Sequence, residues 1–189
     1  GRHLFQTPIP LTTNNAIGQG RVALALEYDG AVYHGWQQQK SGVPSVEQAL
    51  TQAVSKVADE PVDVVCAGRT DAGVHGSYQV VHFDTRAVRN LRSWVMGINT
   101  ALPAGIAVHW AGNAPDPFHA RFSAVYRRYR YVIFNGPVRP ALLARQVSWN
   151  FRPLDETVMQ TAAYQLEGEH DFSAFRAAGC QSKTPWRHM

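Results

Sequence analysis

The 189-residue chain carries 18 lysine and arginine residues against 14 aspartate and glutamate residues, a formal net charge of +4, and 45% of its residues are hydrophobic. This composition excludes an intrinsically disordered chain, and no apolar run approaches the roughly 18 residues of a membrane helix, so we expect a soluble protein. The two cysteines, Cys66 and Cys180, lie far apart without a Cys-x-x-Cys pair, which excludes a disulfide framework and a zinc ribbon and favours the cytoplasm.

The predicted elements begin at Arg21, because residues 1–20 are rich in Thr, Asn, Pro and Gly and are interpreted as an N-terminal tail or an expression remnant. Ser45 with Gln48 forms a capping box that predicts the start of a helix ending near Asp59. Apolar periodicities predict, in chain order, a strand at 21–28, that helix, strands at 62–66 and 78–85, a helix at 91–102 and a strand at 106–111. The order β-α-β-β-α-β indicates an α+β fold of the ferredoxin-like, split βαβ class, with an antiparallel sheet and helices on one face.

A Pro- and Asn-containing interval around residues 113–117 predicts a boundary between a first domain at 21–113 and a second unit at 114–189. The second unit is expected to contain a long strand, Val125–Phe134, and a helix, Asp155–Leu166. Its sequence stops where another strand is expected, so this α/β unit is interpreted as truncated.

The segment at 68–76, Gly-Arg-Thr-Asp-Ala-Gly-Val-His-Gly, has the strongest chemical signal in the chain. Its glycines predict a tight turn that another group approaches closely. Arg69 stands two residues before Asp71, and a neighbouring guanidinium keeps a carboxylate ionised, as a nucleophile or a general base requires. The alternative is an Asx turn in which Asp71 caps the loop and Arg69 is its surface partner.

Between Arg121 and Arg152 the chain contains no Asp or Glu and interleaves its arginines with aromatic residues. The arginines are Arg121, Arg127, Arg128, Arg130, Arg139, Arg145 and Arg152. Arginines for phosphates and aromatic rings for bases are typical of surfaces that bind nucleic acid. The alternative is a basic, solvated face above an ordinary aromatic core.

Other polar residues carry weaker signals. The loop at 33–39 contains Gln37, whose amide is suited to hydrogen bonding. The histidines show no metal-ligand spacing and the chain has no P-loop, so neither a metal nor a nucleotide cofactor is expected. On the residues alone, His75 and His82 are interpreted as hydrogen-bonded structural histidines.

Six ordered motifs together resemble the bacterial tRNA pseudouridine synthase A family. They are Tyr28-Asp29-Gly30 with Tyr33–Gln37, Gly68–Gly76 continuing to Asp84, Asn99–Pro103, Phe118–Arg121, Arg127–Tyr131 and Gly168–Phe172. The resemblance runs from Arg21 to the end of the chain, and the Gly-Arg-Thr-Asp-Ala-Gly-Val-His loop is its most specific part.

The resemblance implies an enzyme that isomerises uridine to pseudouridine at positions 38, 39 and 40 of the tRNA anticodon stem-loop, without a cofactor. It implies that Asp71 is the nucleophile or base acting on a flipped-out uridine, that Arg69 is its ion-pair partner, and that Tyr129 stacks on the base or relays a proton. The substrate-binding residues that it implies are Gln37, His75, Arg121, Arg127, Arg128 and Arg130. It also implies a cytoplasmic homodimer whose subunits have two related α/β domains, the second binding RNA, around a basic cleft.

The family's C-terminal strand and helix, which line the active site, have no counterpart before Met189. The alternative function is a non-catalytic RNA-binding module of ferredoxin-like fold. The aromatic strand motif of RNA-recognition modules is absent from the sequence, which counts against that alternative.

Overall fold

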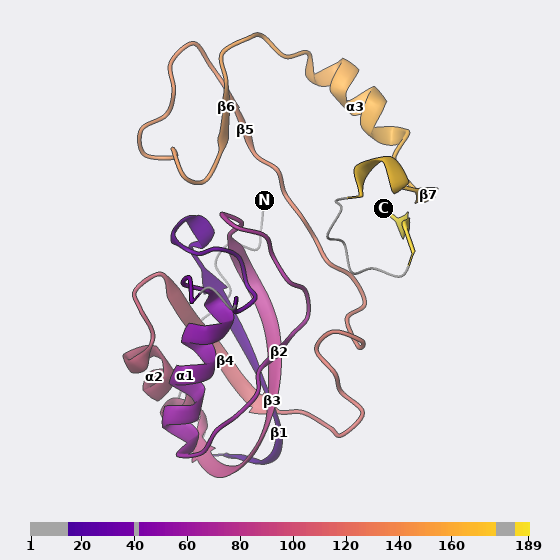
Figure 1. Ribbon diagram of the computed structural model, residues 1–189. Helices are drawn as coiled ribbons and strands as arrows, with labels where there is room; N and C mark the ends of the chain where they lie inside the picture. The colour runs from indigo at the N-terminus through magenta and orange to yellow at the C-terminus, as the bar shows by residue number, and fades with distance from the viewer. Residues whose placement is uncertain (1–14, 40–41, 177–183) are drawn as a thin grey trace. The chain divides into compact units, whose positions relative to one another are not determined.

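A computed structural model describes residues 15–39, 42–176 and 184–189, and the chain divides into two compact units, one ending at Tyr129 and the other beginning at Arg130 (Figure 1). Residues 1–14 and Cys180 lie outside the described part. Among the residues described, no helix is both long and apolar enough to cross a membrane.

Unit 1 contains the β-α-β-β-α-β order that the sequence predicts. Its elements are β1 (Ala16–Tyr28), α1 (Val46–Ala58), β2 (Val65–Cys66), β3 (Gly76–Asn90), α2 (Leu91–Ala101) and β4 (Ile106–Asn113). The strands form one sheet in the order β2-β3-β1-β4, and every neighbouring pair is antiparallel. This is the ferredoxin-like arrangement, so the predicted α+β fold class is confirmed.

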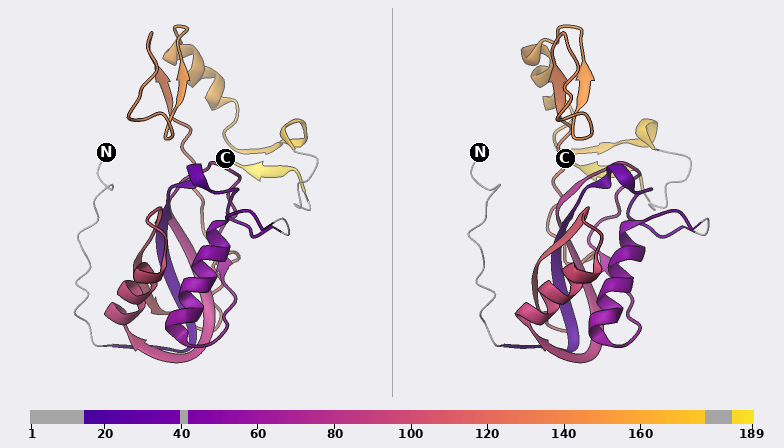
Figure 2. Two further views of the ribbon diagram at one scale, coloured as in Figure 1. Left: turned by 60° about the vertical axis from the view of Figure 1, so that its left-hand side comes forward. Right: turned by 90° about the vertical axis from the view of Figure 1, so that its left-hand side faces the viewer.

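Both helices pack side by side on one face of the sheet (Figure 2). On that face the alternate β1 residues Val22, Leu24 and Leu26 are completely buried. Because successive side chains of a strand point to opposite faces, the residues between them point to the face without helices. Helix α1 begins as its capping box predicts, since the Ser45 hydroxyl accepts a hydrogen bond of 3.3 Å from the Gln48 N–H.

Strand β1 begins at Ala16, earlier than the expected start at Arg21, so the interpretation of residues 16–20 as part of a tail is wrong. The extra residues pair with the far end of β3, which continues to Asn90 rather than stopping at Thr85. Ile17 is buried there, and its carbonyl accepts a hydrogen bond of 2.9 Å from the Trp94 indole. A partner strand more than 60 residues away along the chain thus decides where β1 starts.

The prediction of a long strand at Val125–Phe134 is also wrong. Residues 124–132 have no regular secondary structure, and the first strand after them is β5, Ile133–Asn135. The alternation of arginine and aromatic residues is typical of a strand, but in the described part of the chain no strand pairs with residues 124–132. Without such a partner an alternating segment stays extended and irregular.

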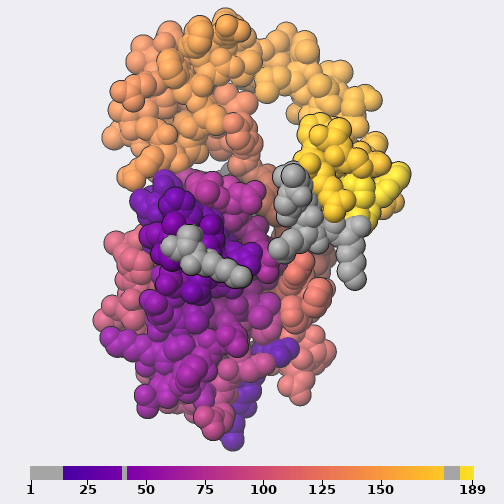
Figure 3. Space-filling model, viewed as in Figure 1, coloured from indigo at the N-terminus to yellow at the C-terminus, as the bar shows by residue number. Residues whose placement is uncertain are grey.

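The described part of unit 2 has two small sheets, one α-helix and a short 3-10 helix, η2 (Ser173–Phe175). Its elements are β5, β6 (Ser148–Asn150), α3 (Glu156–Tyr164), β7 (Glu169–Asp171) and β8 (Trp186–His188), with β5 parallel to β6 and β7 antiparallel to β8. Helix α3 lies within the predicted Asp155–Leu166, and the Asp155 carboxylate caps it. No residue of α3 is buried, and unit 2 is the orange-to-yellow part of the space-filling view (Figure 3).

Candidate active site

The Asp71 loop, residues 67–75 between β2 and β3, is fixed by the segment that follows β1. The Trp36 N–H donates to the Thr70 carbonyl oxygen over 2.9 Å. On the other side of Thr70, its hydroxyl shares a hydrogen bond of 2.9 Å with the Tyr28 hydroxyl. Since Trp36 and Tyr28 are both buried, the residue immediately before Asp71 is tied to the core.

Two glycines permit this close backbone packing. Gly35 has a φ of +88°, and a Cβ there would lie 2.8 Å from the Thr70 carbonyl oxygen. A Cβ on Gly30 would lie 2.0 Å from the Val74 carbonyl oxygen. The two motif segments therefore meet backbone to backbone, and only glycine fits at these positions.

Gln79 fixes the start of the loop from β3. Its side-chain amide donates to the Gly68 carbonyl oxygen over 2.5 Å, and its side-chain oxygen accepts from the Gly68 N–H over 3.4 Å. Gln79 is buried, and its role was not predicted from the sequence. The feature of the sequence that could have indicated this role is the position of a single amide side chain, Gln79, directly before the apolar residues Val80 and Val81.

Asp71 itself is exposed, as are Ala72 and Gly73 after it. Its carbonyl oxygen accepts a hydrogen bond of 3.2 Å from the Val74 N–H, which closes the turn. The backbone of the loop is therefore restrained while the Asp71 carboxylate faces outward, where a substrate can reach it. The pairing of this carboxylate with Arg69 stays a prediction.

Arg69 and Arg121 both influence the buried thiol at the end of β2. The pKa of the Cys66 thiol is raised to about 11: burial is the largest cause and the charge of Glu47 adds to it, while the positive charges of Arg69 and Arg121 act in the opposite direction. The two arginines, separated by about 50 residues in sequence, are therefore both near the start of the Asp71 loop. Such a thiol stays protonated at neutral pH and is a poor nucleophile.

Residues 121–129 bring a guanidinium and a phenol to the same place. Arg127 donates from Nε (3.0 Å) and Nη2 (2.6 Å) to the Ala67 carbonyl oxygen, and from Nη2 (2.9 Å) to the Arg121 carbonyl oxygen. A Cβ on Gly68 would lie 3.1 Å from Arg127 Nε and 3.8 Å from the Tyr129 hydroxyl. The Tyr129 side chain is 72% exposed, so its ring is open for stacking beside the first residues of the loop.

Two further expected substrate-binding residues are His75, in the Asp71 loop, and Gln37, in the segment after β1 that contacts the loop. The Nδ1 atom of His75 lies 3.1 Å from a carboxylate oxygen of Asp29 and accepts from the Gly30 N–H over 3.2 Å. Gln37 is exposed and follows Trp36, whose N–H holds Thr70. His75 therefore links the Asp71 loop to the residues that follow β1.

Arg128 and Arg130 are the last two expected substrate-binding residues. The Arg128 guanidinium lies over the Tyr126 ring, 5.8 Å from its centroid. Arg130 is the first residue of unit 2 and is exposed. Substrate binding by either residue stays a prediction.

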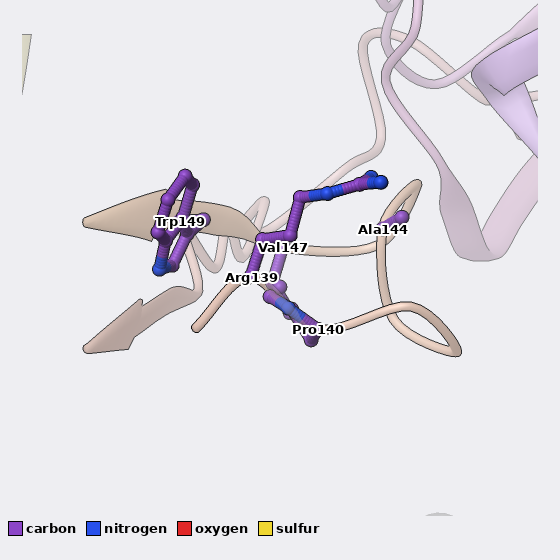
Figure 4. Close-up of a pocket in the computed structure, with 5 residues that line it drawn as sticks. All are labelled: Arg139, Pro140, Ala144, Val147 and Trp149. Carbon is purple, nitrogen blue, oxygen red and sulfur yellow. The ribbon is translucent and has the colours of Figure 1, made fainter. Parts of the chain in front are cut away.

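Unit 2 contains a shallow pocket of about 160 Å³ that none of the expected site residues lines (Figure 4). Its lining residues are Arg139, Pro140, Ala144, Val147 and Trp149. Within the described ranges, no three His, Cys, Asp or Glu side chains gather in a way that could hold a metal ion.

Comparison with known proteins gives a consistent result. A family model described as tRNA pseudouridine synthase matches residues 24–123, which include β1 to β4 from Leu24 onward and the Asp71 loop. The chain is 60% identical over 174 residues to tRNA pseudouridine synthase A of Pseudomonas aeruginosa, covering 92% of this chain and 61% of that protein. It is 58% identical over 169 residues to the protein of the same name from Alcanivorax borkumensis, covering 89% of this chain and 63% of that protein. The chain thus spans about three fifths of the length of these curated relatives.

Proposed function

Because the chain belongs to the tRNA pseudouridine synthase family, we propose that the full-length protein converts uridine to pseudouridine in tRNA, at positions 38, 39 and 40 of the anticodon stem-loop. One observation carries this proposal: the Arg127 guanidinium and the Tyr129 hydroxyl lie beside Gly68, at the start of the loop that presents Asp71. A cation and an exposed aromatic ring thereby lie at the start of the loop that carries the exposed Asp71.

The isomerisation breaks the bond from C1′ to N1 of uridine and forms a bond from C1′ to C5. The proton on C5 leaves and N1 gains a proton, so atoms balance within the substrate and no oxidant or reductant is consumed. A side chain must activate the glycosidic carbon or C6, and a base must accept a proton. We assign these tasks to Asp71, as nucleophile or base, with Arg69 keeping its carboxylate ionised.

A uridine in a stem must leave its stack before the loop can reach it, at a cost of a few kcal/mol. Stacking of the displaced base on an aromatic ring contributes about 1 to 3 kcal/mol and offsets part of that cost. Tyr129 is the aromatic side chain placed for this, since its hydroxyl lies near Gly68 and its ring is exposed. Its hydroxyl is also available to relay a proton.

We assign tRNA binding to Gln37, His75, Arg121, Arg127, Arg128 and Arg130. Positive charge attracts the phosphate backbone, and amide and imidazole groups supply hydrogen bonds. The resemblance further supports a cytoplasmic homodimer in which one tRNA contacts both subunits. Analytical ultracentrifugation of the full-length protein, with and without tRNA, tests the dimer.

The test of catalysis is the release of tritium from tRNA labelled at uridine C5. The wild-type full-length protein is expected to release tritium, and the Asp71→Asn variant is expected to bind tRNA but release none. Asp63→Asn is the matched control, because Asp63 is an equally exposed carboxylate before β2. A wild-type protein that binds tRNA without releasing tritium would establish the alternative, an RNA-binding module without catalysis.

A further inference from the structure

His82 is a buried, titratable side chain to which the proposed chemistry gives no task. It lies on β3 between Val81 and Phe83, whose side chains belong to the helix-covered core, so its own side chain points to the opposite face. It is 4% exposed and lies opposite Ala23 of β1. Its Nδ1 atom accepts a hydrogen bond of 3.0 Å from the Ala120 N–H.

Ala120 belongs to residues 118–123, which we call the anchor turn. A second bond ties this turn to the sheet: Arg21 Nη1 donates to the Phe118 carbonyl oxygen over 2.7 Å. Arg21 is itself held by two bonds of 2.8 Å to the Asp84 carboxylate. His82 and Arg21, on neighbouring strands, therefore fix the anchor turn at two points.

The anchor turn is also braced internally by His119. The His119 N–H donates to the Ser123 hydroxyl over 2.9 Å, and its ring Nδ1 accepts from the N–H groups of Arg121 (3.2 Å) and Phe122 (3.3 Å). The Phe122 ring stacks on the His119 ring, with centroids 4.3 Å apart, and the His119 ring meets the His82 ring edge-on at 4.7 Å. These contacts make the anchor turn one hydrogen-bonded and stacked unit.

The residue after Ala120 in the anchor turn, Arg121, contacts the Arg127 guanidinium beside the Asp71 loop. The Arg121 carbonyl oxygen accepts from Arg127, whose remaining bonds go to the Ala67 carbonyl oxygen. Arg127 is thus held between a carbonyl of the turn and a carbonyl at the base of the loop. Tyr129 follows two residues later, with its hydroxyl near Gly68.

We propose that His82 is a positioning residue for the isomerisation. By accepting from Ala120 it holds the anchor turn in the one arrangement that places Arg127 and Tyr129 over the start of the Asp71 loop. The proposal rests on the proposed function for its catalytic readout, and the hydrogen bond itself has a separate readout by NMR.

The bond also gives the arrangement a pH dependence. A ring nitrogen that accepts a hydrogen bond carries no proton, so neutral His82 holds its proton on Nε2. Burial lowers the pKa of His82, the positive charges of Arg21 on β1 and of His119 in the anchor turn lower it further, and Asp84 on β3 raises it. The bond is therefore intact at neutral pH and is lost as the pH falls below the ordinary value of 6.5, when Nδ1 gains a proton and faces an N–H.

The test compares His82→Leu and His82→Asn in the full-length protein. Leucine removes the acceptor, whereas the asparagine side-chain oxygen stands close to the position of Nδ1 and accepts in its place. In the tritium-release assay we expect kcat to fall at least about tenfold in His82→Leu, with little change in KM, because positioning errors act on the chemical step. His82→Asn is expected to retain most of the wild-type kcat. His109→Asn, at an exposed histidine on β4, is the matched control and should leave kcat unchanged.

A pH series covers the case in which His82→Leu does not fold. The wild-type kcat should decline as the pH falls below 6.5 and His82 gains a proton, and His82→Asn, which cannot titrate, should decline less. Wild-type and His82→Asn profiles that coincide would overturn the proposal, as would an unchanged kcat in a folded His82→Leu or an equal loss in both variants.

The same experiment separates this inference from the proposed function. A wild-type protein that releases no tritium refutes the proposed function, and the positioning role with it. A wild-type protein that does release tritium, with a His82→Leu variant of equal kcat, refutes only the positioning role. NMR of the nitrogen-labelled imidazole is expected to show Nδ1 unprotonated at neutral pH and an Ala120 amide signal that moves on acidification. A protonated Nδ1 at neutral pH would overturn the hydrogen bond itself.

Discussion

Replacing Gln79 with methionine should loosen the start of the Asp71 loop while leaving the packing of β3 nearly unchanged. Methionine has about the volume of glutamine but neither donates nor accepts strongly, so the Gly68 N–H and carbonyl groups both lose their side-chain partner. The bond to the carbonyl is short, at 2.5 Å, and the bond from the N–H is long, at 3.4 Å. The carbonyl bond therefore carries most of the effect.

The size of the effect follows from the partly buried setting of Gly68. Leaving one buried polar group without a partner costs about 1 to 3 kcal/mol, and the longer bond adds little. Water reaching Gly68 reduces the cost, so we expect the free energy of unfolding to fall by about 1 to 2 kcal/mol. Because Gly68 is three residues before Asp71, catalysis should fall further than stability alone explains, by about tenfold in kcat/KM.

Urea denaturation and tritium release, both on the full-length protein, measure the two effects. Gln38→Met is the matched control, because the Gln38 side chain is exposed and its backbone N–H, which the substitution keeps, donates to Glu47. A Gln79→Met variant with the stability and kcat/KM of the wild type would refute the reasoning that the side-chain amide fixes the loop.

Three further predictions concern other parts of the chain. Glu60 accepts hydrogen bonds from hydroxyl and backbone donors of β3, which lower the pKa of its carboxyl group to about 2. The stabilisation that these bonds give should therefore be present above pH 4.5 and be lost between that pH and pH 2. Glu60→Gln should lower the melting temperature at pH 7, and a difference from the wild type that persists at pH 2 would contradict this. Gly35→Ala should lower the free energy of unfolding by at least about 1 to 2 kcal/mol and reduce tritium release, because the positive φ of Gly35 is strained for alanine and the new Cβ would press on the Thr70 carbonyl. An unchanged melting temperature would show that the loop accommodates the Cβ without strain. Arg128→Ala and Arg130→Ala should each reduce the slope of log affinity for tRNA against log salt concentration by about 0.7 to 0.9, the value of one phosphate contact; an unchanged slope would show that these side chains point away from the RNA.

The local elements of unit 1 were predictable because their signals lie within a few residues of one another. The Ser45 capping box starts α1, and the spacing of Leu91, Trp94, Val95 and Ile98 marks the buried face of α2. These periodicities also establish the β-α-β-β-α-β order, and few sheet topologies are compatible with it. The glycine-rich loop with Arg69 and Asp71 was identifiable for the same reason, since a tight turn is specified locally.

Partners distant in sequence decided the remaining features. Residues 16–20 form a strand only because β3 extends to Asn90 beside them, and residues 124–132 form none because no described strand pairs with them. The bonds from Arg127 to Ala67 and from Ala120 to His82 join positions 60 and 38 residues apart.

The amino-acid sequence by itself thus determined where the helices and the central strands of unit 1 lie, and which loop carries Arg69 and Asp71. The tertiary structure alone decided which side chains surround that loop. The physical reason is that hydrogen bonds and burial act through space, and a backbone carbonyl such as that of Ala67 is chemically identical to every other until folding places a donor beside it.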